Sequence, residues 1–293
     1  CLVGMGGAPL FAMSLGEGRQ DNAKKILANA FFALIGISVI VSAVMLSLTR
    51  PILMTFGASE ATYVYAKRYF IVCAAGAVFP IVATGPNQFI IAQGYSGIGM
   101  ATIAIGAVAN IALDPLFIFV FHLDAMGAAI ATVFSQFLSF AFVLLFLRLK
   151  QTKVRLSLRG FSGRIIAKTL KLGLSPFLIM ATDSLIIIVS NAMLQKYGGA
   201  DGDMWITVST VVQAFFSLIT MPMLGISTGS QPVLSFNYGA KNEALIKKAV
   251  KIILSMCIVF TVVMFALSFA VAAPFVSLFT KDPEIARHSV WGI

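Results

Sequence analysis

Two polar side chains, Asn110 and Asp114, interrupt a long apolar run and stand four residues apart. That spacing places both on one face of a helix. Pro115 follows directly and lacks a backbone N–H, so it frees the carbonyl of Ile111 from its usual helical hydrogen bond. A carboxylate, an amide oxygen and a free carbonyl form the hard oxygen cluster that Na⁺ prefers. Alternatively, the carboxylate binds one proton, or the pair only makes hydrogen bonds between helices.

Four other polar positions in apolar runs are weaker candidates for a coupling or substrate site. Asp183 is the second acid inside an apolar run. A role in coupling or substrate binding and a structural hydrogen bond between helices are equally good interpretations of it. Gln231, next to Pro232, marks either a broken span facing a cavity or simply close helix packing. Asn87 and Gln88 either line a polar lumen or make hydrogen bonds between helices.

The composition excludes a soluble protein. Of 293 residues, 59% are hydrophobic and 11% are charged, whereas soluble domains carry about 25% charged residues. The basic residues, which give a net charge of +10, lie between apolar runs, which indicates membrane topology and not nucleic-acid binding. A phosphate-binding loop and a nucleophile–base or Cys/His metal set are absent from the sequence, so we expect neither an enzyme nor a cofactor.

The apolar runs predict an all-α polytopic membrane protein, because lipid cannot satisfy an open strand edge. Full spans are expected near 26–48, 66–92, 98–121, 127–147, 169–195, 204–228 and 247–273, with partial ones at the two ends. One set of alternate loops carries 15 Lys and Arg and the other carries 6. The first side is therefore predicted to be cytoplasmic, including the basic linker 148–171, which we expect to form an interfacial helix.

An internal repeat appears when the sequence is shifted by 223 residues. The shift aligns Gly6 with Gly229, Pro9 with Pro232, Gly16 with Gly239, and Lys24–Lys25 with Lys247–Lys248. Both copies have the same orientation, so they form a parallel repeat. It predicts two six-helix lobes, twelve helices in an intact protein, of which this sequence lacks both ends. The expected domains are an N-lobe at 1–150 (second half of helix 2 to helix 6), a linker at 151–168, and a C-lobe at 169–293 (helices 7–9 and the start of helix 10).

Several motifs together resemble the multidrug and toxic compound extrusion (MATE) family. The segments 225–232 and 237–242 are similar to the signature after the second C-lobe helix of that family, and 4–18 is similar to the N-lobe copy. The segment 110–115, followed by 127–132, resembles the fifth and sixth N-lobe helices. The motifs at 173–177 and 197–199 are similar to the MepA-like branch.

The resemblance implies a secondary antiporter that exports organic cations in exchange for Na⁺ or H⁺ by alternating access. Family members hold the cation with an Asn and an Asp of the fifth helix and a Thr of the sixth, positions that match Asn110, Asp114 and Thr132. We expect a multi-pass cell-membrane protein, monomeric, with small organic cations and the bilayer as partners. The alternatives are a lipid-linked oligosaccharide flippase of the same superfamily and, in a different class, a passive channel.

Overall fold

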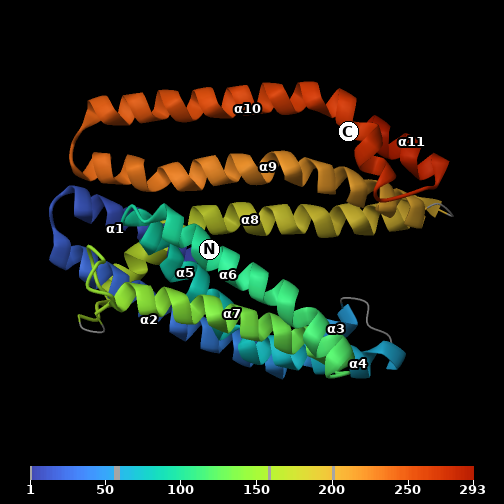
Figure 1. Ribbon diagram of the computed structural model, residues 1–293, viewed down its shortest axis with the longest axis horizontal. Helices are drawn as coiled ribbons and strands as arrows, with labels where there is room; N and C mark the ends of the chain where they lie inside the picture. Colours follow the sequence, from blue (N-terminus) through green and yellow to red (C-terminus); the bar gives the residue numbers. More distant parts are fainter. Residues whose placement is uncertain (1, 56–59, 158–159, 200–201) are drawn as a thin grey trace. The chain divides into compact units, whose positions relative to one another are not determined.

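The computed structural model describes residues 2–55, 60–157, 160–199 and 202–293, and all its regular elements in these ranges are helices (Figure 1). The all-α prediction is therefore confirmed. The elements in chain order are α1 (Leu2–Gly16), α2 (Gln20–Ser47), α3 (Thr49–Thr55), α4 (Glu60–Gly76), α5 (Val78–Ala92), α6 (Ser96–Pro115), the π-helix η1 (Leu116–Val120), α7 (Asp124–Arg148), α8 (Gly163–Tyr197), α9 (Gly202–Gly239), α10 (Glu243–Ser277) and α11 (Pro283–Gly292).

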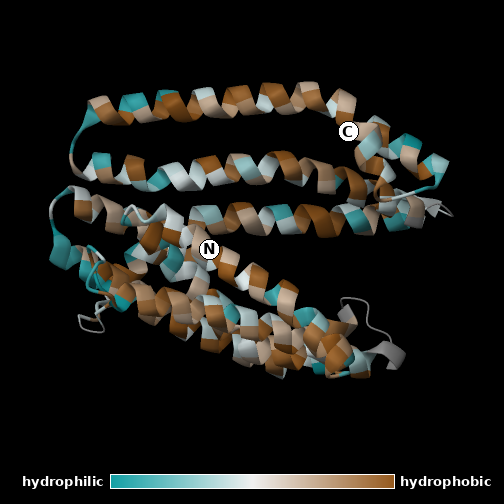
Figure 2. Cartoon of the chain, in the orientation of Figure 1, coloured by the Kyte–Doolittle hydropathy of each residue, from teal (hydrophilic) through white to brown (hydrophobic). Residues whose placement is uncertain are grey.

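Six of the described helices are long and apolar enough to cross a membrane. The segment predicted as one span at 66–92 is instead a pair, Tyr63–Gly76 and Val78–Ala92, bent by 41°. Pro80 explains the bend, because it cannot donate a hydrogen bond to the carbonyl of Gly76 four residues earlier. Figure 2 shows the pattern expected of spanning helices, with hydrophilic residues at the α1–α2 and α9–α10 turns.

The chain divides into two compact units, which are described separately. The first unit comprises the residues up to Pro176 together with Ser235–Lys241, and the second comprises Phe177–Leu234 and Asn242–Ile293. The lobes predicted at 1–150 and 169–293 belong to an intact protein and remain a prediction. In the second unit, α10 begins at Glu243 because the Asn242 side chain accepts a hydrogen bond from the Leu245 backbone N–H.

The core of the first unit lies where α1, α2, α5 and α7 meet. Phe11 of α1 and Phe89 of α5 are fully buried and pack edge to face, with ring centroids 5.4 Å apart. Leu27 of α2 and Leu147 of α7 are also fully buried in this cluster. Such edge-to-face packing favours one arrangement of neighbouring helices over others. This core holds α7, which carries part of the candidate site, at a defined position.

The basic linker predicted at 148–171 is not one separate interfacial helix, because, apart from Arg148, only its last part, 163–171, is helical, as the start of α8. Between Arg148 at the end of α7 and Gly163 at the start of α8, the described residues form turns, bends and irregular chain. Val154 in this segment is fully buried and belongs to the core of the first unit. The predicted linker residue Arg159 lies outside the described residues. The linker is thus packed against the helices by its apolar side chains, whereas an interfacial helix would lie on the membrane surface.

The C-terminal ends of α1 and α9 approach each other closely at Gly16 and Gly239, two glycines that the 223-residue shift aligns. A Cβ atom on Gly16 would collide with the carbonyl of Phe236, and one on Gly239 would collide with the carbonyl of Met13. Met13 and Phe236 are themselves related by the 223-residue shift. Within the first unit, each of the two glycines therefore faces a carbonyl of the other helix. Glycine permits this approach because it has no side chain between the two backbones.

We predict that Gly16→Leu destabilises the protein, because the new side chain occupies the position of the Phe236 carbonyl. Overpacking of this kind costs about 1–3 kcal/mol. Gly36→Leu in α2 is the matched control, since a side chain there meets open space. Thermal unfolding of the detergent-purified intact protein should show a lower midpoint for Gly16→Leu only. Equal midpoints for the two variants would contradict the close crossing.

Candidate functional site

The structure brings together the three side chains to which the family resemblance assigned a cation. Asn110 and Asp114 lie one turn apart on α6, and Thr132 lies on α7, which packs against α6. The Asn110 amide nitrogen is 3.3 Å from Asp114 Oδ1 and 3.4 Å from Thr132 Oγ1, so it donates to both oxygens. All three side chains are half-buried. The amide therefore bridges a carboxylate and a hydroxyl that belong to two different helices.

This arrangement becomes an oxygen site for a cation if the Asn110 amide turns over. Its Oδ1 would then take the place of the nitrogen, 3.3–3.4 Å from the other two oxygens. Two oxygen ligands at right angles around an ion with bonds of about 2.4 Å lie about 3.4 Å apart. The spacing therefore suits a small hard cation. One carboxylate supplies one negative charge, which balances either a monovalent ion or a proton.

The residues that follow Asp114 in the sequence depart from a regular α-helix. Pro115 ends α6, and the next five residues form the π-helix η1, in which the Phe121 N–H donates to the carbonyl of Leu116. Pro115 cannot donate to the carbonyl of Ile111, as the sequence predicted. Short π-helical segments occur frequently at functional sites. The irregularity lies directly beside the carboxylate.

The sequence reasoning missed Tyr69 of α4. Tyr69 interacts electrostatically with Asp114, and Cys73 stands one turn along the same helix. A tyrosine in an apolar run is ordinarily a packing residue, and nothing in its local sequence distinguishes it. Only the packing of α4 places it near this site.

The remaining predicted residues lie elsewhere. Asp183 is exposed on α8 in the second unit, and no described residue hydrogen-bonds or ion-pairs with its side chain. Gln231 is half-buried on α9. Asn87 is buried in α5 and donates to the carbonyl of Gly99 on α6 at 3.1 Å, the helix–helix hydrogen bond that was the alternative to a lumen position. Gln88 is half-buried and packs near Gly4 of α1.

Comparison with known proteins identifies the family. The MatE family model matches residues 1–116 and 177–290. The chain belongs to the MatE family. The matched range includes Asn110 and Asp114 of the candidate site, and it leaves out Thr132 and the linker. Thr132 therefore depends for its assignment on the geometry and on its resemblance to the sixth N-lobe helix.

Individual relatives agree with the family. The chain is 28% identical to the multidrug export protein MepA of Staphylococcus aureus (strain MSSA476) over 296 positions, which cover 99% of this chain and 64% of that protein. It is 25% identical to MepA of Staphylococcus haemolyticus (strain JCSC1435), covering 97% of this chain and 62% of that protein. The chain thus spans somewhat less than two thirds of the length of these MatE relatives.

Solved structures show the same fold. A crystal structure of MATE in the bent conformation superimposes with a TM-score of 0.90 at 24% identity, covering 99% of this chain and 64% of that one. A second structure is that of a MOP superfamily transporter from Pyrococcus furiosus Vc1 (DSM3638), for which the reverse polarity of the binding pocket suggests a different function. It superimposes with a TM-score of 0.89 at 24% identity, covering 99% of this chain and 64% of that one. Together with the apolar spans, the MatE fold establishes a multi-pass membrane protein.

We predict that Thr132→Val distinguishes a bound Na⁺ from a bound proton. The variant keeps the shape of the side chain and removes the hydroxyl oxygen, which a Na⁺ ion needs as a ligand and a protonated Asp114 does not. If Na⁺ binds, stabilisation of the purified intact protein against heat by NaCl should need about tenfold more salt in Thr132→Val. Titrations with KCl provide the ionic-strength reference.

Thr132→Ser is the matched control, because it retains the oxygen and should keep the NaCl response. A wild-type NaCl response that Thr132→Val leaves unchanged would contradict Thr132 as a sodium ligand.

Proposed function

We propose that the intact protein is a secondary transporter that exports organic cations, in the manner of a multidrug efflux protein, in exchange for Na⁺ or H⁺. The observation that carries the proposal is the oxygen cluster of Asp114, Asn110 and Thr132 inside spanning helices. Ionised groups inside the membrane are costly and usually mark an ion or proton path. Relatives named as multidrug export proteins support the direction and the class of substrate.

Coupling follows from the linkage between cation binding and conformation. A bound ion shifts the balance between two states only by its difference in affinity for them. The Asp114 site combines residues of α6 and α7 with Tyr69 nearby on α4. A rearrangement of these helices changes the distances among its oxygens, and with them the affinity for the ion. One carboxylate suffices for one-to-one exchange with a monovalent organic cation.

The charge distribution favours cationic or neutral substrates over pyrophosphate-linked lipids. A flippase for such lipids needs Arg or Lys within its cavity to hold the phosphates. In the described spanning helices, the basic side chains lie near the helix ends, and α9 from Met204 to Gly239 has none. The binding pocket of the Pyrococcus furiosus transporter is of reverse polarity, which suggests a different function for that protein. We therefore use the charge of the spanning helices to choose between classes of substrate.

We predict that Asp114→Asn abolishes gradient-driven transport in proteoliposomes that contain the intact protein. A fluorescent organic cation would be followed while a Na⁺ gradient or a pH gradient is imposed separately. The wild type should move the dye with one of the two gradients, and Asp114→Asn should fall to the rate of empty liposomes, because the amide cannot supply the negative charge. Asp124→Asn, at the exposed start of α7, is the matched control and should retain transport.

Three outcomes would contradict the proposal. Unchanged transport by Asp114→Asn would remove the carboxylate from the coupling mechanism. Unitary conductance in planar bilayers would indicate the passive channel. Failure of both gradients to move the dye, together with flipping of a lipid-linked oligosaccharide, would indicate the flippase.

A further inference from the structure

The first half of the linker is an ordered strap against the helices of the first unit. We define the strap as residues 149–157 and 160–162. The Gln93 side-chain oxygen accepts a hydrogen bond from the Val154 N–H at 2.9 Å, and the Tyr95 hydroxyl donates to the Gln151 carbonyl at 2.8 Å. Both partners belong to the short turn between α5 and α6. The strap backbone is thereby attached at two points.

Asn29 of α2 holds the second half of the strap. Its side chain is fully buried and donates to the Gly160 carbonyl at 2.9 Å and to the Lys25 carbonyl at 2.7 Å. Its oxygen accepts from the Ser162 N–H at 2.7 Å. One amide therefore satisfies backbone groups on both sides of the contact. A fully satisfied buried polar group of this kind specifies a single arrangement.

The strap alternates between buried and exposed side chains. Thr152 and Val154 face the helices and are buried, whereas Lys153 and Arg155 are exposed. The backbone contacts therefore fix which side chains turn outward, and these are basic.

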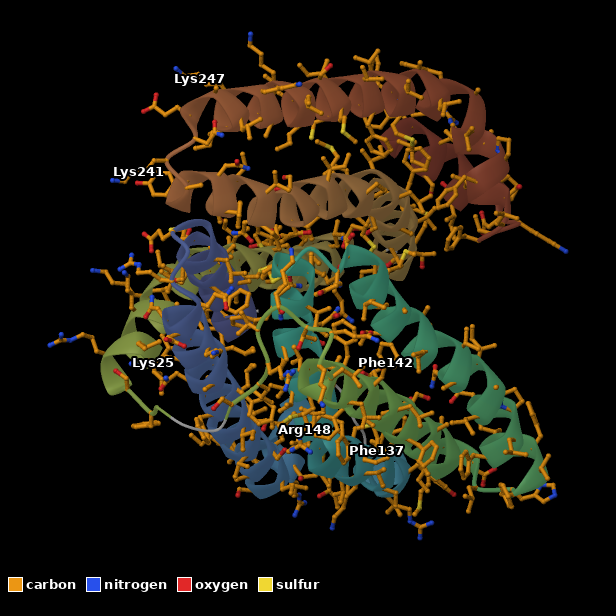
Figure 3. All side chains as sticks on the ribbon, turned by 60° about the vertical axis from the view of Figure 1, so that its left-hand side comes forward. Lys25, Phe137, Phe142, Arg148, Lys241 and Lys247 are labelled. Carbon is orange, nitrogen blue, oxygen red and sulfur yellow. The ribbon has the colours of Figure 1, made fainter. Side chains whose placement is uncertain are left out.

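Other exposed basic side chains flank the strap in the sequence, and the Lys25 side chain lies against Gly160. No described residue forms an ion pair with any of these basic side chains. By contrast, nearby Arg19 and Lys24 pair with Glu17 and Asp21. Figure 3 labels Lys25 and Arg148, which belong to α2 and α7. The basic surface consists of Lys25, Arg148, Lys150, Lys153, Arg155, Arg164 and Lys168.

Two large apolar side chains accompany these charges. Leu149 is 48% exposed and Phe161 is 71% exposed, at opposite ends of the strap. The surface lies between the end of α7 and the start of α8, two helices that are long and apolar enough to cross a membrane. Exposed apolar groups beside Lys and Arg are typical of segments that contact the membrane interface.

We propose that the basic surface is a binding site for anionic phospholipid headgroups of the adjacent leaflet. Charge complementarity selects the headgroup, and Leu149 and Phe161 extend toward its acyl region. The positive-inside rule requires only a surplus of Lys and Arg in this loop. It does not require a loop whose backbone is hydrogen-bonded by Asn29 and Gln93, and that order is what a site needs to hold several cations at fixed positions. The proposal is independent of the transport function.

The test is native mass spectrometry of the purified intact protein with equimolar phosphatidylglycerol and phosphatidylcholine. We expect the wild type to retain phosphatidylglycerol preferentially, and Lys153→Gln with Arg155→Gln to lower that preference about tenfold, since each basic residue near an anionic surface contributes separately. Lys67→Gln with Arg68→Gln is the matched control, because it removes one Lys and one Arg from exposed positions on α4. An equal loss of preference in both double variants would overturn the proposal.

A second variant separates order from charge. Asn29→Ala keeps every charge but releases Gly160 and Ser162, so trypsin should cut the strap sooner and the preference for phosphatidylglycerol should fall. Monodisperse elution in size-exclusion chromatography shows that a variant is folded. Accelerated cleavage of a folded Asn29→Ala protein with wild-type lipid preference would overturn the ordered site, since net charge alone would then suffice.

Discussion

The hydrocarbon of a bilayer offers no hydrogen bonds to the peptide backbone, and the architecture of this chain depends on that constraint. Each spanning segment satisfies its own N–H and C=O groups as a helix. Departures occur where proline removes a donor, with a bend ahead of Pro80 and a π-helix after Pro115. The backbone after Pro115 regains hydrogen bonds through the longer π-helical pattern. The second of these departures borders Asp114.

The same constraint separates the polar side chains into groups. Most hydroxyls bond to the carbonyl one turn earlier in their own helix, as Thr182 and Ser184 do. A few cross between helices, including Ser139, whose hydroxyl donates to the Thr102 carbonyl at 2.9 Å. Among the described residues, the contact from Asn110 to Thr132 differs from these because the same amide also holds a carboxylate. A charge at that position inside a membrane is costly, and cation coupling is the function that we propose for it.

Outside the hydrocarbon, water competes for backbone groups, so the strap depends on side chains to hold it. Asn29 and Gln93 replace the hydrogen bonds that a helix would have supplied, and Val154 anchors the segment in the core. A chain with so few charged residues concentrates many of its cations here. The strap therefore combines a backbone held by hydrogen bonds with a high density of positive charge.

The spanning segments follow from the sequence alone, because length and hydropathy decide whether a segment crosses a membrane. The pairing of Asn110 with Asp114 also follows, since helix geometry fixes side chains four residues apart, and the 223-residue repeat matched Gly16 to Gly239. The sequence did not reveal Tyr69 near Asp114, the non-helical strap, or the reciprocal crossing of α1 and α9. Each of these depends on contacts between segments far apart in the chain. Periodicity is encoded by neighbouring residues, whereas such contacts are decided by how whole helices pack.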